Sequence, residues 1–407
     1  MKIRETILLV ILIFPTLLFS SCARGNTSTK NPEVDSLIQQ LGDSDRLKGG
    51  EASRQLYKLS RDSDDVIPSL IKALRNDNPN IRAGAVNTLF LISAEKKVPE
   101  DQIVRMLKDK DISVRVEAAT AVGYMHKDAK EVLPILLEGM DDEDYNIRTK
   151  AIFAFQLFRY EINKEVPQVV PYLLKALRDE NRMVSFSAGA TLSEFGALAV
   201  PGLIDALGDS NPALRDTAAY ALGLIGPDAS DAVPALVNAL ADDEPRIRYK
   251  AAIALANISG SDAKEALPIL IEGLRGDNRN GIQLESAEAL AKMGTAAKDA
   301  IPGLLEELKT ASDMGKSAIA FALAKISPSE VEIGVNALIE ELDNENASYR
   351  LYAAGDLGDL GTSAKAALPK LKEVSEKEQP EYARNVELDA IAKIEGNAPD
   401  AETPSGN

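Results

Sequence analysis

The chain has 407 residues, of which 45% are apolar and 5% aromatic, and it contains no Trp. This length exceeds the usual size of a single-core domain, and the apolar share excludes wholesale disorder, so we expect several cores or one core extended by repetition. The formal net charge of −17 disfavours non-specific binding to nucleic acid, although it is compatible with solubility alone, with basic partners or with divalent cations.

Residues 1–21 have the composition of a secretory signal peptide. Lys2 and Arg4 provide a short basic start, and an apolar run follows. That run is shorter than the roughly 20 residues of a comfortable membrane span, and Pro15 interrupts it. We therefore expect the protein to be exported.

The only cysteine, Cys22, directly follows this leader. The segment that ends in Cys22 resembles a bacterial lipobox, whose cysteine is lipidated and becomes the mature N-terminus, but Phe19 stands where lipoboxes usually carry Leu. The alternative is an ordinary leader that is cleaved after Ala23. Residues 22–32 are polar and aperiodic, as expected of a flexible tether. The lipobox implies a membrane-anchored lipoprotein of the bacterial cell envelope, on the periplasmic or outer-membrane side, that contacts lipid through its anchor only.

A unit of 33 or 34 residues repeats over residues 33–396, and a polar tail that we expect to be disordered, residues 397–407, follows it. Its landmark is a proline with an arginine 14 residues later, and four repeats have both: Pro68 and Arg82, Pro134 and Arg148, Pro201 and Arg215, Pro234 and Arg248. Other repeats have Ser185, Ile282 or Lys316 in the arginine position. An insertion of about three residues is expected near 158–164, where one interval lengthens to 37.

The clearest unit spans residues 232–265 and predicts two helices. Pro234 stands near the start of the first helix, where its missing N–H costs nothing. Pro245 opens the second helix and Gly260 ends it. One face of the second helix is apolar at Ile247, Ala251, Leu255 and Ile258. A single pair cannot bury this face alone, so stacked copies must share a continuous core.

Segments such as LGDSNPALRDTAAYALGLIG resemble HEAT repeats, especially the short subtype similar to phycobilisome-lyase HEAT-like repeats. The resemblance covers residues 33–396 and implies an all-α, armadillo-like right-handed α-solenoid of about eleven two-helix repeats. It also implies a structural ladder of hydrogen bonds between neighbouring repeats, made by an Asp in the turn and an Arg in the second helix. The matching pairs are Asp109 and Arg115, Asp142 and Arg148, Asp209 and Arg215, and Asp242 and Arg248. Because Asp179 is matched with Ser185, we expect the ladder to break there.

The second helices also predict a surface for a partner. Counting from each ladder Arg at 100° per residue, positions one, five and nine after it point away from the core face. In solenoids of this type those positions line the concave groove. Several of them are apolar or aromatic: Tyr124, Phe153, Leu157, Phe186, Tyr220, Leu224, Tyr249 and Ile253. The alternative is that superhelical twist covers these side chains and makes them ordinary core.

Patterns for catalysis are missing from the sequence. There is no GxxxxGK phosphate loop, and the single histidine, His126, falls between two expected helices and supplies no catalytic triad. Deoxyhypusine hydroxylase, another HEAT-like solenoid, needs His-Glu pairs for its two irons, and this chain has none. We therefore expect no catalytic residues, no metal site and no cofactor.

The sequence thus favours a non-catalytic adaptor of the bacterial envelope, which holds a protein or peptide in its concave groove and does not bind nucleic acid. Two alternatives stay open. One is a HEAT-like lyase or hydroxylase relative, for which a bound chromophore or metal would speak. The other is a rigid structural spacer without a specific ligand, in which case changes in the groove would have no effect.

Overall fold

A computed structural model describes residues 31–126, 129–157, 166–275, 281–311, 313–377 and 381–396. Within these ranges the chain folds into helices and contains no β-strand. None of the helices in these ranges has the length and hydropathy needed to span a membrane. The leader with Cys22, the tail at 397–407, the insertion expected near 158–164 and the side chain of Leu157 lie outside the described residues.

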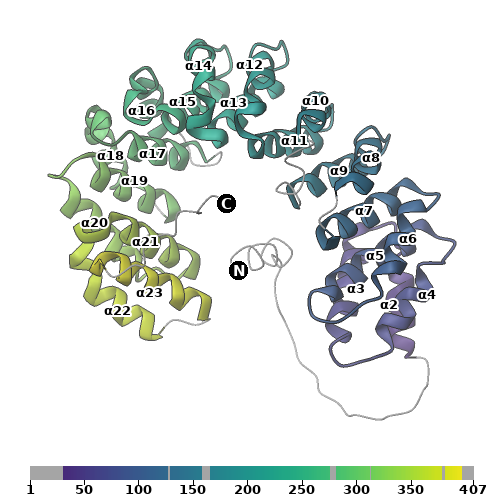
Figure 1. The fold of residues 1–407 in the computed structure, drawn as a ribbon. Coiled ribbons are helices and arrows are strands. Elements are labelled where there is room, and N and C mark those ends of the chain that lie inside the picture. The colour runs from purple at the N-terminus through teal and green to yellow at the C-terminus, as the bar shows by residue number, and fades with distance from the viewer. Residues whose placement is uncertain are drawn as a thin grey trace. The chain divides into compact units, whose positions relative to one another are not determined.

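The described helices form eleven consecutive pairs, each made of a first and a second helix (Figure 1). Two pairs belong to a compact unit, residues 1–98, and nine belong to a second unit, residues 99–407. The first unit contains α2 (Pro32–Gln40), α3 (Arg46–Leu59), α4 (Val66–Ala73) and α5 (Pro79–Ser93).

In the second unit the even-numbered helices are the first helices of each pair. They are α6 (Glu100–Arg105), α8 (Ala129–Met140), α10 (Val166–Ala176), α12 (Val200–Leu207), α14 (Val233–Ala239), α16 (Leu267–Leu274), α18 (Ile301–Glu307), α20 (Val331–Glu341) and α22 (Leu368–Lys377). The second helices are α7 (Ile112–His126), α9 (Tyr145–Leu157), α11 (Arg182–Glu194), α13 (Pro212–Ile225), α15 (Pro245–Ser259), α17 (Ile282–Met293), α19 (Asp313–Ile326), α21 (Ala347–Leu360) and α23 (Glu381–Glu395).

Helix ends follow the local sequence. The side chain of Asn211 accepts a hydrogen bond from the backbone N–H of Ala213 at 3.0 Å, and Pro212 occupies the first helical position of α13. Gly226 ends the same helix at φ 69°, a conformation that a residue with a Cβ rarely adopts. A 3-10 helix, Gly226–Ala232, then leads into α14. The predicted boundaries at Pro245 and Gly260 are those of α15.

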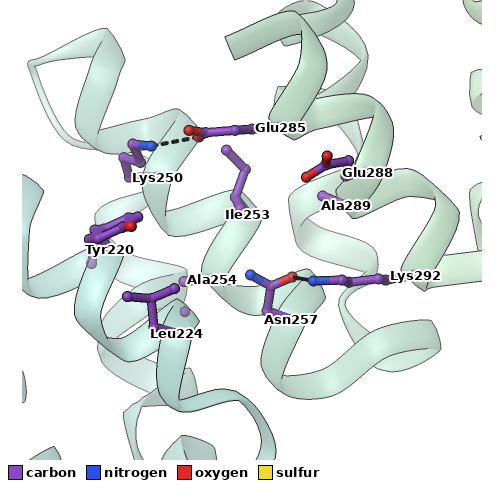
Figure 2. Close-up of a pocket in the computed structure, with 12 residues that line it drawn as sticks. Tyr220, Leu224, Lys250, Ile253, Ala254, Asn257, Glu285, Glu288, Ala289 and Lys292 are labelled. Carbon is purple, nitrogen blue, oxygen red and sulfur yellow. Dashed lines mark hydrogen bonds and ion pairs between the residues drawn. The ribbon is translucent and has the colours of Figure 1, made fainter. Parts of the chain in front are cut away.

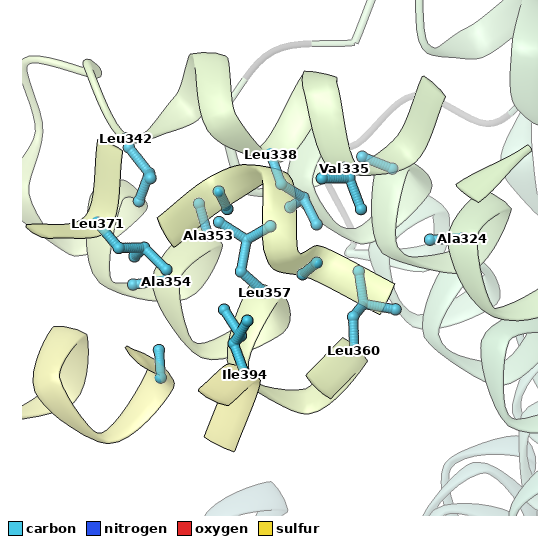
Figure 3. Close-up of a cluster of buried hydrophobic side chains, with 14 of the residues drawn as sticks. Ala324, Val335, Leu338, Leu342, Ala353, Ala354, Leu357, Leu360, Leu371 and Ile394 are labelled. Atoms are coloured by element: carbon cyan, nitrogen blue, oxygen red, sulfur yellow. The ribbon is translucent and has the colours of Figure 1, made fainter. Parts of the chain in front are cut away.

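Within the second unit, successive second helices pack on one another, as α13 does on α15 and α15 on α17, and each also packs on the first helix of its own pair. The core lies between these two layers. Figure 3 shows its C-terminal part, where side chains from four helices meet and are buried: Leu338 of α20, Leu357 of α21, Leu371 of α22 and Ile394 of α23. The apolar faces of neighbouring repeats therefore form one continuous core, as expected for an α-solenoid.

Two assignments made from the sequence are wrong. In α17 the buried residue of the arginine position is Gln283, whose Nε2 donates to the carbonyl of Leu274 at 2.9 Å, and not Ile282. Gly281 precedes this helix in a left-handed conformation, at φ 70°. The repeat positions in α17 are therefore one residue later than the sequence count places them. His126, which we placed between helices, is the last residue of α7, and its side chain is outside the described part.

Candidate partner-binding site

The ladder of hydrogen bonds fixes the spacing of the repeats beneath the candidate site. Arg148 Nη1 donates to the carbonyl of Asp142 at 2.8 Å, and Arg215 Nη1 donates to that of Asp209 at 2.9 Å. The remaining donors of each guanidinium bind a carboxylate of the following repeat. Arg148 binds Asp179 at 2.7 and 2.9 Å, and Arg215 binds Asp242 at the same distances. Each Arg therefore uses the carbonyl of its own Asp and the carboxylate of the next.

The ladder is irregular at two places. Arg115 donates to the carbonyl of Asp109 at 3.0 Å, but its carboxylate partner is Glu138 of α8. Ser185 Oγ donates to the carbonyl of Leu177, so the step from Ser185 to Asp209 is missing as expected, although Asp179 itself is bound by Arg148. Arg248 donates to the carbonyl of Asp242 at 2.9 Å, and residues 276–280 of the following repeat lie outside the described residues.

The predicted stripe of apolar side chains lies on the face of the second helices that is turned away from the core. None of its seven described side chains is buried. Phe153, Phe186 and Leu224 are 46%, 51% and 50% exposed, and the others, Tyr124, Tyr220, Tyr249 and Ile253, are half-buried. The exposures of Phe153, Phe186 and Leu224 do not fit the alternative in which the stripe is ordinary core. Exposed aromatic side chains in a row are typical of a binding surface.

Four residues on successive second helices are joined across this face. The rings of Phe186 and Tyr220 stack with centroids 5.5 Å apart and planes inclined by 22°. Lys250 Nζ lies 5.2 Å from the centroid of the Tyr220 ring, and it forms an ion pair with Glu285 at 2.5 Å. This chain of contacts runs from α11 to α17 and holds the exposed rings in place.

A pocket of about 240 Å³ opens beside this chain, between α13, α15 and α17. Figure 2 shows Ile253 near its centre, with Tyr220 on one side in that view and Glu288 on the other. Lys292 Nζ donates to Asn257 Oδ1 at 2.7 Å across the lower part of the pocket in that view. The lining also includes Ala219, Gly223, Leu224, Lys250, Ala254, Glu285 and Ala289. Three of the predicted residues, Tyr220, Leu224 and Ile253, therefore share one pocket.

Position one after the arginine does not belong to this pocket. Tyr249 donates its hydroxyl hydrogen bond to Glu272 Oε1 of α16 at 2.9 Å and is not part of the lining. Val116, at the equivalent position in α7, is buried against Gly139 of α8. Tyr249 and Val116 point toward the first helix of the next repeat, whereas Phe186, at the same position in α11, is exposed and stacks on Tyr220. Tyr249 therefore lies at the rim.

Sequence reasoning missed the charged half of the pocket, namely Lys250, Glu285, Glu288 and Lys292. Counting from Ile282 places Glu288 six residues after the reference position, whereas the structural reference, Gln283, places it at position five. Glu288 is therefore the equivalent of Ile253 in the preceding repeat. The signal that could have shown this shift is Gly281, since a glycine before a helix often adds a left-handed residue.

Two carboxylates on this face have raised pKa values. Partial desolvation raises the pKa of Glu288, the nearby Lys292 opposes this shift, and Glu285 adds to it. Burial raises the pKa of Asp356 on α21 to about 7, and the negative charges of Asp359 and Glu288 contribute. The structure therefore places unfavourable negative charge at the α17 to α21 end of the face.

The described residues contain no group of three or more His, Cys, Asp or Glu side chains arranged to hold a metal ion. The chemistry that the face offers is that of recognition: aromatic rings, aliphatic side chains, an amide and carboxylates, with ion pairs that fix their positions.

Comparison with known proteins bears on the repeats directly. Residues 200–291, which include α12 to α17 and the pocket, match the family model for HEAT repeats. Residues 200–291 carry HEAT repeats. No curated protein sequence matches the chain.

Several solved structures are similar to this chain. YibA of Escherichia coli is 23% identical, covering 67% of this chain and 94% of that one, with a TM-score of 0.47. A chain from the complex of CpcE and CpcF of phycocyanin lyase, from a Nostoc species, is 26% identical over 55% of this chain and 94% of that one, with a TM-score of 0.39. Kap95p, from a structure of its binding to RanGDP, is 13% identical, with a TM-score of 0.47, over 89% of this chain and 56% of that one.

Proposed function

We propose that the protein is a non-catalytic adaptor whose HEAT repeats bind a protein or peptide on the exposed face of the second helices α9 to α17. The observation that carries this proposal is the pocket between α13, α15 and α17, because Tyr220, Leu224 and Ile253 line it and none of them is buried in the core. A solenoid gains nothing in stability from apolar side chains that stay in water. Their burial against a partner is the function that such side chains support best.

Contacts among the side chains of this face hold them in fixed positions, which supports this proposal. Phe186 stacks on Tyr220, Lys250 lies over Tyr220, and Glu285 holds Lys250. Because these contacts exist without a partner, less side-chain entropy is lost on binding. An extended segment or a helix that lies along α11 to α17 would cover Phe186, Leu224 and Ile253 together.

The proposal places this adaptor in the bacterial envelope as a lipoprotein anchored at Cys22. Its support is the leader with its basic start, short apolar run and single cysteine. Mass spectrometry of the membrane-purified protein should show an N-terminal diacyl or triacyl modification at Cys22. A Cys22→Ser variant should be released from the membrane fraction. An unmodified N-terminus after Ala23 would replace this part of the proposal with ordinary secretion.

The test of binding is crosslinking capture from native envelope membranes. The wild type is compared with a double variant, Phe186→Ser and Ile253→Ser, which removes two apolar side chains of the face. The control is Leu198→Ser, which changes an exposed apolar residue (59%) in the connection before α12. We expect a protein that the wild type and the control capture and the double variant does not. Equal capture by all three would favour the structural spacer, and a chromophore or metal that copurifies would favour the enzyme alternative.

A further inference from the structure

Only some of the charged side chains in the pocket form an ion pair there. Lys250 forms its ion pair with Glu285, and Lys292 donates to the neutral side chain of Asn257. Glu288, between them in the lining, has no hydrogen bond or ion pair with any described residue. The nearby charge of Lys292 only partly offsets the desolvation of Glu288, so a cation of a partner that bound this carboxylate directly would be favoured.

A second carboxylate without an ion pair to a described residue lies further along the face. Asp356 of α21 is half-buried and makes no ion pair within the described part of the chain. The nearby cations are used by its neighbour, because Lys393 Nζ lies 3.1 Å from the Asp359 carboxylate and Lys325 Nζ donates to the Asp359 carbonyl. Glu288 and Asp356 are also close enough for the negative charge of Glu288 to act on Asp356. Glu288 and Asp356 are therefore two carboxylates at this end of the face that make no ion pair with a described residue.

We propose that the occupant of the pocket is a peptide segment of the partner that presents a Lys or Arg side chain to Glu288 beside an aliphatic or aromatic side chain seated on Leu224 and Ile253. This inference rests on the proposed function and adds the chemistry of the partner. The guanidinium or ammonium group gives Glu288 the direct ion pair that it lacks among the described residues. The apolar neighbour buries against the aliphatic side chains and the Tyr220 ring.

The test is a selection of random 12-residue peptides, displayed on phage, on the purified full chain. A chelator is present so that divalent cations cannot bridge the carboxylates. The wild type is compared with Glu288→Gln and Glu288→Lys. The control is Glu332→Gln, which makes the same charge change at an exposed position of α20 outside the pocket. A fourth variant, Ile253→Ser, shows whether the peptides bind at the face at all.

We expect wild-type peptides to share a Lys or Arg at a fixed spacing from an apolar residue. Binding should weaken at least tenfold with Glu288→Gln and Ile253→Ser, and stay unchanged with Glu332→Gln. Glu288→Lys should select Asp or Glu at the basic position. This inference is wrong if the selected peptides require Ile253 but contain no preferred Lys or Arg, or if they keep a preferred Lys or Arg with Glu288→Gln. Either result would leave the proposed function standing. Peptides unaffected by Ile253→Ser, or no selected peptides, would count against both.

Discussion

The guanidinium of Arg215 binds the carboxylate of Asp242 through two hydrogen bonds, Nε to Oδ2 at 2.7 Å and Nη2 to Oδ1 at 2.9 Å. The same guanidinium donates to the carbonyl of Asp209, and Asp242 Oδ1 accepts from the N–H of Glu244. One ion pair thus joins the turns of two neighbouring repeats beneath the pocket. Arg215 lowers the pKa of Asp242, as expected for a partly buried pair with this geometry.

Replacing Arg215 with Met should reduce the free energy of unfolding by on the order of 2 kcal/mol, because it leaves the Asp242 carboxylate and two turn carbonyls without their donor. The matched control is Arg246→Met, which removes an exposed pair with Asp216 at 3.0 and 3.1 Å and should cost less than about 1 kcal/mol. Urea unfolding of both variants measures the difference. Equal costs would show that the ladder adds no more than a surface pair.

Asp356 should make stability fall as pH rises from about 4 to about 7. Its pKa is about 7 in the folded chain, against an ordinary pKa of 3.8, so between these values the unfolded chain has lost the proton that the folded chain keeps. The stability from this group is complete below that window and lost above it. Asp359 and Glu288 oppose its ionisation, while Lys325 and Lys393 are bound to Asp359.

Asp356→Asn should therefore melt at a higher temperature than the wild type at pH 8 and lose most of the difference at pH 4. The expected gain at pH 8 is on the order of 2 kcal/mol. The control, Asp262→Asn, changes an exposed carboxyl and should follow the wild type at both pH values. A variant with an unchanged pH profile would show that the Asp356 carboxyl is ionised in the folded chain at much lower pH.

Two helical glycines make a second matched pair. A Cβ on Gly334 of α20 would lie 2.3 Å from the carbonyl oxygen of Ala320, so Gly334→Ala should destabilise the fold by about 1–3 kcal/mol. A Cβ on Gly355 of α21 would meet nothing within 4 Å, and Gly355→Ala should stabilise by about 0.5–1 kcal/mol. Thermal unfolding of both variants checks the opposite signs, and a neutral Gly334→Ala would refute the close approach of α19 and α20.

Much of the fold was predictable because its landmarks are local. Pro245 and Gly260 mark the ends of α15, and Ile247, Ala251 and Leu255 are buried as their helical spacing indicates. These features depend only on helix geometry and capping, which short stretches of sequence encode.

The candidate site was predictable only in part, since its members meet across repeats. Tyr220 and Ile253 were found by counting along single helices, but the pairing of Lys250 with Glu285 depends on how α15 and α17 align. The left-handed Gly281 shifts α17 by one residue, and that shift brings Glu288 into the pocket. The partner of each ladder Arg likewise depends on packing between repeats. No local pattern reports Arg115 binding to Glu138.

The most direct test of the proposed binding site is site-specific photocrosslinking in intact cells. A photoreactive amino acid replaces Leu224 in the pocket or Leu198 outside it. We expect one discrete protein adduct from position 224. This adduct should be absent at position 198, and it should be lost when Phe186→Ser and Ile253→Ser are added. No adduct at position 224, or the same adducts at both positions, would contradict a binding site on the second-helix face.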